Sequence, residues 1–251
     1  MIDFTFTMYQ HLLRAIAETG YKVYTVKQYL AEQPQTNFII LRHDVDLVPS
    51  KTLVLVKMEA ERGLHSTCYF RTKGNLFDHK IMHQIQDMGH EVGYHFETLD
   101  TCKGNFEESI SLFEKELALF RKAGIVVDTV CSHGNPRVKK VGYRTNNDIF
   151  LHDRELMAKT VILGEAYLSL DFAKLHYFSD SGRKWNSARD TKEVIDQIIR
   201  KVHPVIYILV HPHWWAQSSL GAISLNMVSR AAYLRYFLQT KQFLKYFKKV
   251  S

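Results

Sequence analysis

The 251-residue chain is 46% hydrophobic and 24% charged, which is enough for a substantial core in one large domain or two small ones. Six of its seven formal net positive charges arise after Gly221, where six Lys or Arg residues and no acidic residue occur, so the rest of the chain carries 27 basic and 26 acidic side chains. That near balance argues against nucleic-acid binding.

The cysteines and the N-terminal sequence favour a reducing compartment. Cys68, Cys102 and Cys131 are odd in number and lack metal-ligand spacing, which argues against a disulfide framework. The first residues show no basic region followed by an apolar one, and no apolar run reaches the roughly 18 residues of a membrane span. We therefore expect a cytoplasmic protein that does not span a membrane.

Apolar periodicity and turn residues predict alternating strands and helices. A helix over 4–19 and a short one over 26–32 form a helical lead-in, 1–36. Strands are expected at 37–43, 65–72, 91–96, 125–131, 164–171, 174–179 and 205–210, with helices at 50–63, 78–89, 105–124, 153–159 and 191–202. About seven strands in this rhythm predict a parallel barrel or a doubly wound sheet. No repeat or linker divides the chain, so we expect a single domain.

The stretch after Gly221 predicts a basic amphipathic helix over 221–251. Its aromatic residues include Tyr233, Phe237, Phe243 and Tyr246. Packing of this aromatic stripe on the domain is the favoured interpretation. Peripheral contact with an anionic membrane surface is the alternative.

Two carboxylates end the first long strand. Asp44 and Asp46 follow an apolar run from Phe38 at a spacing of two, so in a strand both project from the same face. Two carboxylates that close repel each other unless a metal or a shared proton compensates. A strand followed by an Asx-rich turn before Pro49 is the structural alternative.

Further polar groups follow the other strands. In parallel α/β folds the carboxyl ends of strands meet at one edge. Here these ends supply His95 and Glu97, then Ser132, His133 and Asn135, then Asp180, and finally His211 and His213. Imidazoles and carboxylates together suit metal-assisted hydrolysis, with spare groups for proton transfer.

These segments, taken in order from Phe38 to Trp215, resemble the polysaccharide deacetylase family, also known as the NodB-homology domain of carbohydrate esterases. His43-Asp-Val-Asp46 resembles a variant of its first motif, and Gly89-His-Glu-Val-Gly-Tyr-His95 its second. Ser179-Asp-Ser-Gly-Arg-Lys-Trp185 is similar to the fourth motif and Leu209-Val-His211 to the fifth. The resemblance implies a distorted (β/α) barrel over 37–220.

The resemblance also implies roles for individual residues. Asp44 would be the catalytic base, His211 the general acid, and Asp180 a supporting carboxylate. Asp46 and His95 would bind a divalent metal ion, zinc being favoured. Leu209, Trp185, Arg183 and Trp214 would line the substrate site.

Two positions depart from the family pattern. The second metal-binding His of the family falls four residues after His95, where this chain has Leu99. We therefore predict His133, at the end of the neighbouring strand, as the third ligand, with Glu97 as the alternative. The place of the third motif, where the family has an Arg that orients the base, reads Cys131-Ser-His-Gly-Asn-Pro136 and has no Arg. Arg183 or Arg42 could orient the base instead.

The expected function is metal-dependent removal of an N-acetyl or other N-acyl group from an amino sugar or glycan precursor. Asp44 would take a proton from the attacking water and His211 would protonate the departing amine. Two alternatives stay open: a deacetylase-like carbohydrate-binding domain without turnover, and a hydrolase of other linear amides. The expected partner is the carbohydrate substrate, with no nucleic acid.

Overall fold

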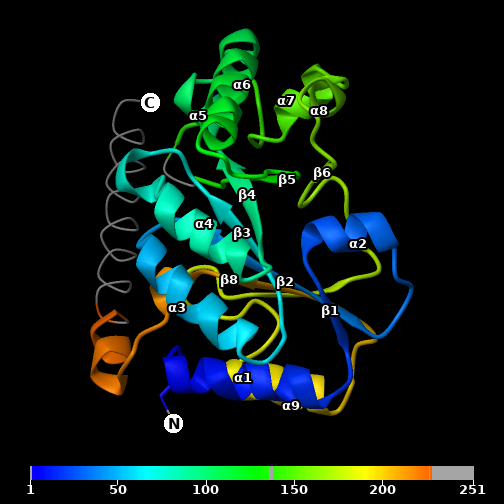
Figure 1. Cartoon of the computed structure of the whole chain (residues 1–251), viewed down its shortest axis with the longest axis vertical. Helices are drawn as coiled ribbons and strands as arrows, with labels where there is room; N and C mark the ends of the chain where they lie inside the picture. The colour runs from blue at the N-terminus through cyan, green and yellow to red at the C-terminus, as the bar shows by residue number, and fades with distance from the viewer. Residues whose placement is uncertain (1, 136–137, 226, 228–251) are drawn as a thin grey trace, which may run out of the picture.

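A single parallel sheet, curled into part of a barrel, forms the centre of the molecule (Figure 1). The computed structural model describes residues 2–135, 138–225 and 227. Its strands follow the order β6-β5-β4-β3-β2-β8-β7, and β1 pairs beside the first half of β2. The strands are β1 (Lys22–Tyr24), β2 (Phe38–Val45), β3 (Thr67–Phe70), β4 (Glu91–Phe96), β5 (Thr129–Ser132), β6 (Gly164–Glu165), β7 (His176–Ser179) and β8 (Val205–Val210).

This sheet confirms the predicted distorted (β/α) barrel. All strand pairs are parallel. Strands β6 and β7 end the series, and no pairing joins them within the described residues, so the barrel is open on that side. Strand β2 lies near the middle, between β3 and β8, and this position brings its C-terminal carboxylates into the centre of the edge.

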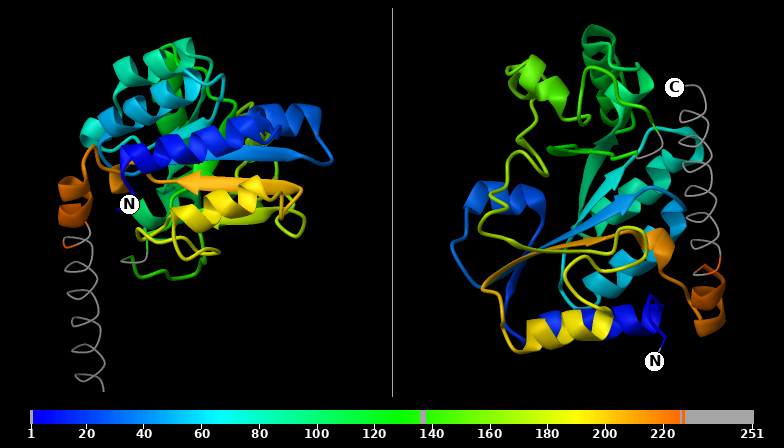
Figure 2. Two further views of the ribbon diagram at one scale, coloured as in Figure 1. Left: turned by 90° about the horizontal axis from the view of Figure 1, so that it is seen from below. Right: turned by 180° about the vertical axis from the view of Figure 1, so that it is seen from behind.

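Helices cover the outside of the curled sheet (Figures 1 and 2). Several begin with a side chain that accepts a backbone N–H of the first turn, as at Asp78, Asn105 and Asp190. The helices are α1 (Phe6–Glu18), α2 (Val26–Glu32), α3 (Pro49–Ala60), α4 (His79–Asp87), α5 (Thr98–Thr101), α6 (Phe106–Lys122), α7 (Asp148–His152), α8 (Leu156–Lys159) and α9 (Thr191–Ile199), with short 3₁₀ turns η1 (Gly74–Leu76) and η2 (Pro212–Trp214).

The two faces of the sheet have different environments. On the outer face, one apolar cluster joins β3 and β4 to α4 and α6, and a second joins β2 and β8 to α1 and α9. A smaller cluster, including Tyr69, Cys131 and Tyr207, fills the interior of the barrel. Alternate residues of each strand therefore point either to the helices or to the barrel interior.

A buried carboxylate lies on the outer face of β2. Glu59 of α3 is fully buried and accepts hydrogen bonds from Tyr9 (2.5 Å) and Ser66 (2.6 Å), while His43 Nε2 lies 2.7 Å from its Oε1. Burial opposes its charge, but the adjacent His43 and His90 imidazoles lower the pKa of Glu59. His43 thus belongs to the helix side, opposite its neighbour Asp44.

Some predicted elements are shorter than expected, and three helices or strands were not predicted. The strand expected at 164–171 ends after Glu165, because the Glu165 carboxylate accepts the backbone N–H groups of Tyr167 (2.7 Å) and Leu168 (2.8 Å) and turns the chain. The strand expected at 125–131 begins only at Thr129. Strand β1 and helices α5 and α7 had no clear sequence signal.

The beginning of the chain is joined to the segment after η2. Phe6 N–H donates to the Ala216 carbonyl (2.8 Å), and Ala216 N–H donates to that of Phe4 (2.9 Å). Helix α1 lies beside α9 (Figure 2). Most of the predicted C-terminal helix, 226 and 228–251, lies outside the described residues.

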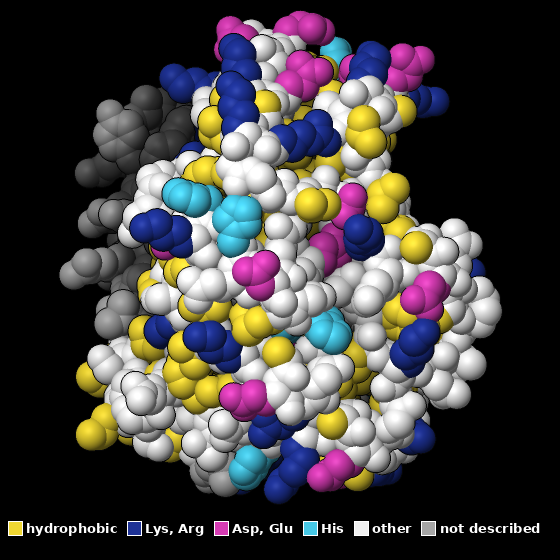
Figure 3. Space-filling view, in the orientation of Figure 1, with side chains coloured by type: hydrophobic (Ala, Val, Ile, Leu, Met, Phe, Trp, Pro, Cys, Tyr) yellow, Lys and Arg dark blue, Asp and Glu magenta, His cyan; other side chains and the backbone are white. Residues whose placement is uncertain are grey.

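Basic and acidic side chains are interspersed on the face drawn in Figure 3. Among the described residues, no helix combines the length and apolar character needed to cross a membrane.

Candidate metal and acid–base site

The carboxyl ends of four strands bring the predicted polar residues together inside the barrel mouth. Strand β2 contributes Arg42, Asp44 and, just beyond its end, Asp46, which alternate along one face. The ends of β4, β5 and β8 contribute His95, His133 and His211, respectively. The sheet order therefore places side chains from distant parts of the sequence around one point.

Asp46, His95 and His133 form a group that could hold a metal ion. One ligand atom from each lies within 4.8 Å of the others. Asp46 Oδ1 is 3.4 Å from His95 Nε2 and 3.5 Å from His133 Nε2. This oxygen is buried and has no hydrogen-bond partner among the described residues, which is costly for a carboxylate unless a cation binds it.

The two imidazoles are oriented so that each presents a lone pair to Asp46. His95 Nδ1 lies 3.0 Å from the Cys131 carbonyl oxygen, and His133 Nδ1 lies 3.1 Å from Glu97 Oε2. Because both partners accept hydrogen bonds, we assign the proton to Nδ1 in each ring. The Nε2 atoms are then free as ligands, an arrangement usual at metal sites.

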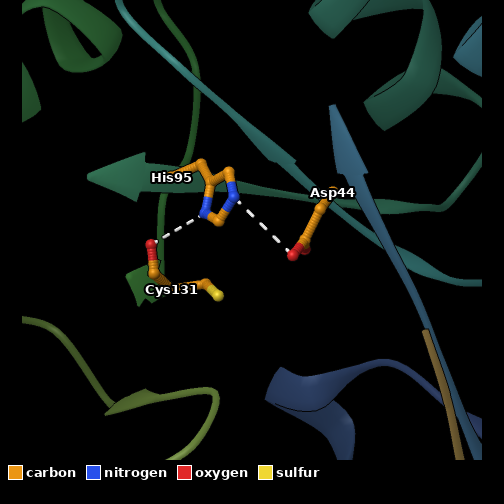
Figure 4. A group of neighbouring side chains, drawn as sticks. All are labelled: Asp44, His95 and Cys131. Carbon is orange, nitrogen blue, oxygen red and sulfur yellow. Dashed lines mark hydrogen bonds and ion pairs between the residues drawn. The ribbon is translucent and has the colours of Figure 1, made fainter. Parts of the chain in front are cut away.

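A second group, Asp44, His95 and Cys131, also has closely spaced donor atoms (Figure 4). It fits a metal less well. Both oxygens of Asp44 already accept hydrogen bonds from Arg42, at 2.7 and 2.6 Å. Burial raises the pKa of the Cys131 thiol well above its usual value, so the thiolate needed for ligation is disfavoured.

Asp44 is held as a carboxylate beside the metal group. Burial alone would raise its pKa, but Arg42 and His95 outweigh that effect, and the pKa of Asp44 is lowered. Arg42 is fully buried and donates further hydrogen bonds to the hydroxyls of Tyr207 (2.9 Å) and Tyr167 (3.0 Å). Asp44 Oδ2 lies 3.6 Å from His95 Nε2, so the base candidate faces the metal group.

His211 and Asp180 form a pair at the ends of β8 and β7, on the other side of β2 from the two histidines of the metal group. His211 Nδ1 is 2.7 Å from Asp180 Oδ1, and Asp180 Oδ2 accepts from the indole N–H of Trp215 (2.9 Å). Burial disfavours the imidazolium, yet the Asp180 carboxylate more than compensates and raises the pKa of His211 to about 9. His211 Nε2 points to the site, 3.8 Å from Asp46 Oδ2.

Glu97, the alternative third ligand, lies beside the metal group and contacts two cations. Its Oε1 lies 2.5 Å from Arg71 Nη2 and 2.7 Å from Lys73 Nζ, and its Oε2 is the atom that contacts His133. Burial opposes its charge, but His133, Lys73 and Arg71 lower the pKa of Glu97, so it is ionised at neutral pH.

The residues predicted to bind substrate occupy different environments. Leu209 lies on the same face of β8 as His211, and Trp214 is half-buried in η2. Trp185 is buried among Phe4, Phe178 and Trp215 and has almost no surface for a substrate.

The guanidinium of Arg183 also points away from the metal group. It donates to the carbonyl oxygens of Ala222 (2.5 Å) and Trp214 (3.4 Å). Of the two arginines predicted to orient the base, Arg42 is therefore the one that contacts Asp44.

Sequence reasoning did not identify several supporting groups. Arg71, Lys73, Tyr167, Tyr207 and Trp215 all contact site residues through their polar ends. Only Arg71 and Tyr207 had a usable signal, since each lies on a strand or just after one, on the inward-facing side. Leu99, at the position where the family that the motifs resemble has its second His, is fully buried in the apolar cluster of β3 and β4.

Comparisons with known proteins give similarity in fold only. No family model and no curated protein matches the sequence. A solved CE4 family pseudoenzyme from Bacillus anthracis is 14% identical, with a TM-score of 0.47, and the match covers 79% of this chain and 62% of that one. This chain thus spans less than two thirds of that protein's length.

Two further solved structures are similar to this chain. A family 4 carbohydrate esterase from Streptomyces lividans, in complex with acetate, is 16% identical with a TM-score of 0.47, covering 79% of this chain and 90% of that one. The catalytic domain of a peptidoglycan N-acetylglucosamine deacetylase from Eubacterium rectale is 12% identical with a TM-score of 0.49, covering 79% and 86%. These values are low, so the chemistry below rests on the site residues themselves.

Proposed function

We propose that this protein is a metal-dependent hydrolase that removes an N-acetyl or related N-acyl group from an amino sugar or glycan precursor. The observation that carries the proposal is the unpartnered oxygen of Asp46, which lies between two imidazole lone pairs and is flanked by an ionised carboxylate and a protonated imidazole. A ligand group, a base and an acid thus share one buried edge.

Asp46, His95 and His133 would hold the ion. Two imidazoles and one carboxylate are the ligand set of many catalytic zinc sites, which favours zinc. A divalent ion bound there would supply Lewis-acid activation of water and of the acyl carbonyl.

The protein's own groups would divide the proton transfers. Asp44 is ionised and is therefore able to accept a proton from the attacking water. Arg42 fixes the direction of both Asp44 oxygens through two hydrogen bonds. His211 is protonated at neutral pH and could donate its Nε2 proton to the departing amine nitrogen, while Asp180 stabilises the charged ring.

The amino-sugar substrate follows from the motif resemblance; among the similar solved structures, the Eubacterium rectale protein is named as a peptidoglycan N-acetylglucosamine deacetylase. Leu209, on the face of β8 that carries His211, is our candidate for contact with the acyl group, and Trp214 for contact with the sugar. Apolar side chains beside an acid suit a small acyl group.

The test is hydrolysis of N-acetylated chito-oligosaccharides and acetylated sugar nucleotides by purified protein, with acetate release measured before and after chelation and zinc reloading. Activity that disappears with the chelator and returns with zinc is expected. Zinc binding and glycan binding without acetate release would favour the carbohydrate-binding alternative. Release of acyl groups only from non-sugar amides would favour the linear-amide alternative.

A further inference from the structure

We propose that Glu97 is a positioning residue for the metal site, which fixes the His133 ring so that its Nε2 faces Asp46 and His95. This inference rests on the proposed metal site but not on the substrate or the reaction. Glu97 acts through His133, and the cations Arg71 and Lys73 hold Glu97 in turn.

The backbone of His133 is fixed, but its ring requires a partner. Its N–H donates to the Phe96 carbonyl (2.7 Å), and its own carbonyl accepts from Asn146 Nδ2 (2.9 Å). The His133 side chain is 13% exposed. Besides Asp46, which faces Nε2, it contacts the Glu97 carboxylate, whose Oε2 lies 3.1 Å from Nδ1. A carboxylate at this nitrogen selects the tautomer with the proton on Nδ1 and leaves the lone pair on Nε2.

Two cations limit where Glu97 can go. Its Oε1 contacts Arg71 Nη2 (2.5 Å) and Lys73 Nζ (2.7 Å), and its side chain is only 6% exposed. Turning Glu97 toward a metal would break both ion pairs and leave the mostly buried Arg71 without its carboxylate, a costly change. The arrangement therefore favours Glu97 as a support for His133 over Glu97 as a ligand.

The same support extends to the other carboxylate of the site. Arg71 Nη1 approaches the backbone carbonyl oxygen of Asp46 at 3.5 Å, a long contact. Arg71 follows β3, the strand between β2 and β4. One guanidinium thus spans from the chain that carries Asp46 to the carboxylate that orients His133.

The experiment is a double-mutant cycle on zinc affinity, measured by calorimetric or competitive titration of Zn²⁺ into metal-free protein. Glu97→Gln should weaken zinc binding by about 10–100-fold, the usual effect of removing such a partner. In a His133→Gln background the same change should alter zinc affinity by less than about twofold, because the group through which Glu97 acts is gone.

Glu107→Gln is the matched control. Glu107 also pairs with an imidazole, His152 Nε2 at 3.4 Å, but on the exposed surface of α6 and α7. It should leave zinc affinity unchanged. A second measurement uses ¹⁵N NMR of the metal-free protein at a pH where His133 is neutral: the wild type should show the proton on Nδ1, and Glu97→Gln should show a mixture of tautomers.

The outcomes separate the two proposals. Equal zinc affinity of Glu97→Gln and the wild type, or an equal loss from this change in both backgrounds, would overturn the positioning role while leaving the metal site intact. No zinc binding by the wild type would overturn the metal site and with it the proposed function. If Glu97→Gln unfolds, Glu97→Asp keeps the charge that Arg71 needs but withdraws the carboxylate by one methylene, and undiminished zinc affinity in that variant would also refute the role.

Discussion

At the scale of single residues, two carboxylates on one strand face have different partners and therefore different chemistry. Both oxygens of Asp44 accept hydrogen bonds from Arg42, whereas Oδ1 of Asp46 has no hydrogen-bond partner among the described residues. The alternation of a strand predicts that both point the same way. It does not predict which of them a cation will neutralise, because the position of Arg42 depends on the Tyr167 and Tyr207 hydroxyls contributed by remote segments.

Replacement of Asp44 by Asn should lower turnover while keeping zinc binding. We expect kcat to fall by about 10²–10⁴, the usual contribution of a positioned proton acceptor. The melting temperature should also fall, because the buried Arg42 loses its counter-charge at a cost of roughly 3–5 kcal/mol. Activity per zinc-loaded, folded molecule, measured well below the melting temperature, separates the two effects.

The control for this variant is Glu59→Gln. Glu59 is likewise buried and paired with an imidazole, but it lies on the helix side of β2. This change should lower the melting temperature and leave kcat nearly unchanged. Full turnover in the folded Asp44→Asn protein would rule out Asp44 as the base.

The His211–Asp180 pair should set the alkaline limb of the activity profile. His211 donates a proton only as imidazolium, so kcat/KM should fall as the pH rises through about 9. Asp180→Asn removes the charge that stabilises the ring and should move this limb toward about 6.5, the ordinary value for His. A pH–rate profile of the variant that overlies that of the wild type would argue against the pairing.

The same shift has a consequence for stability, with a definite sign. The pKa of His211 is higher in the folded protein than in the unfolded chain. The pair therefore stabilises the fold fully below about pH 6.5, and this contribution is lost as the pH rises through about 9. Asp180→Asn should flatten this part of the stability curve.

At the scale of elements, the packing of the barrel interior depends on a glycine in β4. Gly93 of β4 faces the ring of Tyr69 on β3: a Cβ at this glycine would lie 2.3 Å from Tyr69 Cε1 and 2.8 Å from the Thr129 carbonyl oxygen. The Tyr69 ring in turn lies 5.3 Å from the Arg42 guanidinium carbon. The absence of a side chain at Gly93 thus leaves room for the Tyr69 ring, which packs beside the arginine that binds Asp44.

Gly93→Ala should destabilise the protein by about 1–3 kcal/mol through overpacking. It should also lower kcat, because a displaced Tyr69 would disturb Arg42. Gly221→Ala is the matched control, since its Cβ would only reach ordinary contact at 3.4 Å from Ala216 and Ser218. Chemical unfolding gives the free energy, and a Gly93→Ala protein as stable as the control would contradict this packing argument.

Most elements could be predicted from the sequence because their signals are local. The capping side chains of Asp78 and Asn105 and the continuous apolar run 205–210 each predict their element directly. The strand at 164–171 was predicted too long because its end depends on a carboxylate that turns back onto its own backbone. Likewise, Trp185 matched a family motif, but its side chain is buried by the N-terminal Phe4, which the motif does not include.

At the scale of the whole molecule, the metal group joins parts of the chain that are far apart. Asp46 follows β2, His95 lies in β4 and His133 follows β5, so ion binding would tie three strands together. A zinc ion that binds only the folded state must therefore stabilise the whole barrel. The strand order shows that the ligands come from neighbouring strands. The sequence alone could only suggest this, because His95 and His133 do not form a motif of fixed spacing.

Zinc at about 100 times its dissociation constant should stabilise the fold by about 2.7 kcal/mol, which corresponds to a rise in melting temperature on the order of 5–10 °C for a protein of this size. Differential scanning calorimetry with zinc and with a chelator measures the difference. Asp46→Ala should abolish it, because the central ligand is lost. A rise that survives in Asp46→Ala would place the stabilising ion elsewhere.

The hydrogen bonds that join Phe4 and Phe6 to Ala216 can form only late in synthesis, after Ala216 has been added to the chain. Helix α1 is made well before its partners β8 and α9, which are among the last described elements in the chain. Strand β2, which carries Asp44 and leads to Asp46, likewise cannot pair with β8 until that strand has been made. Contacts between such distant segments form slowly, so the apolar face of α1 must stay shielded by other means while the chain grows. A growing chain therefore acquires its acid, His211, only when β8 finally pairs, after the strands that carry the base and the metal ligands have been made.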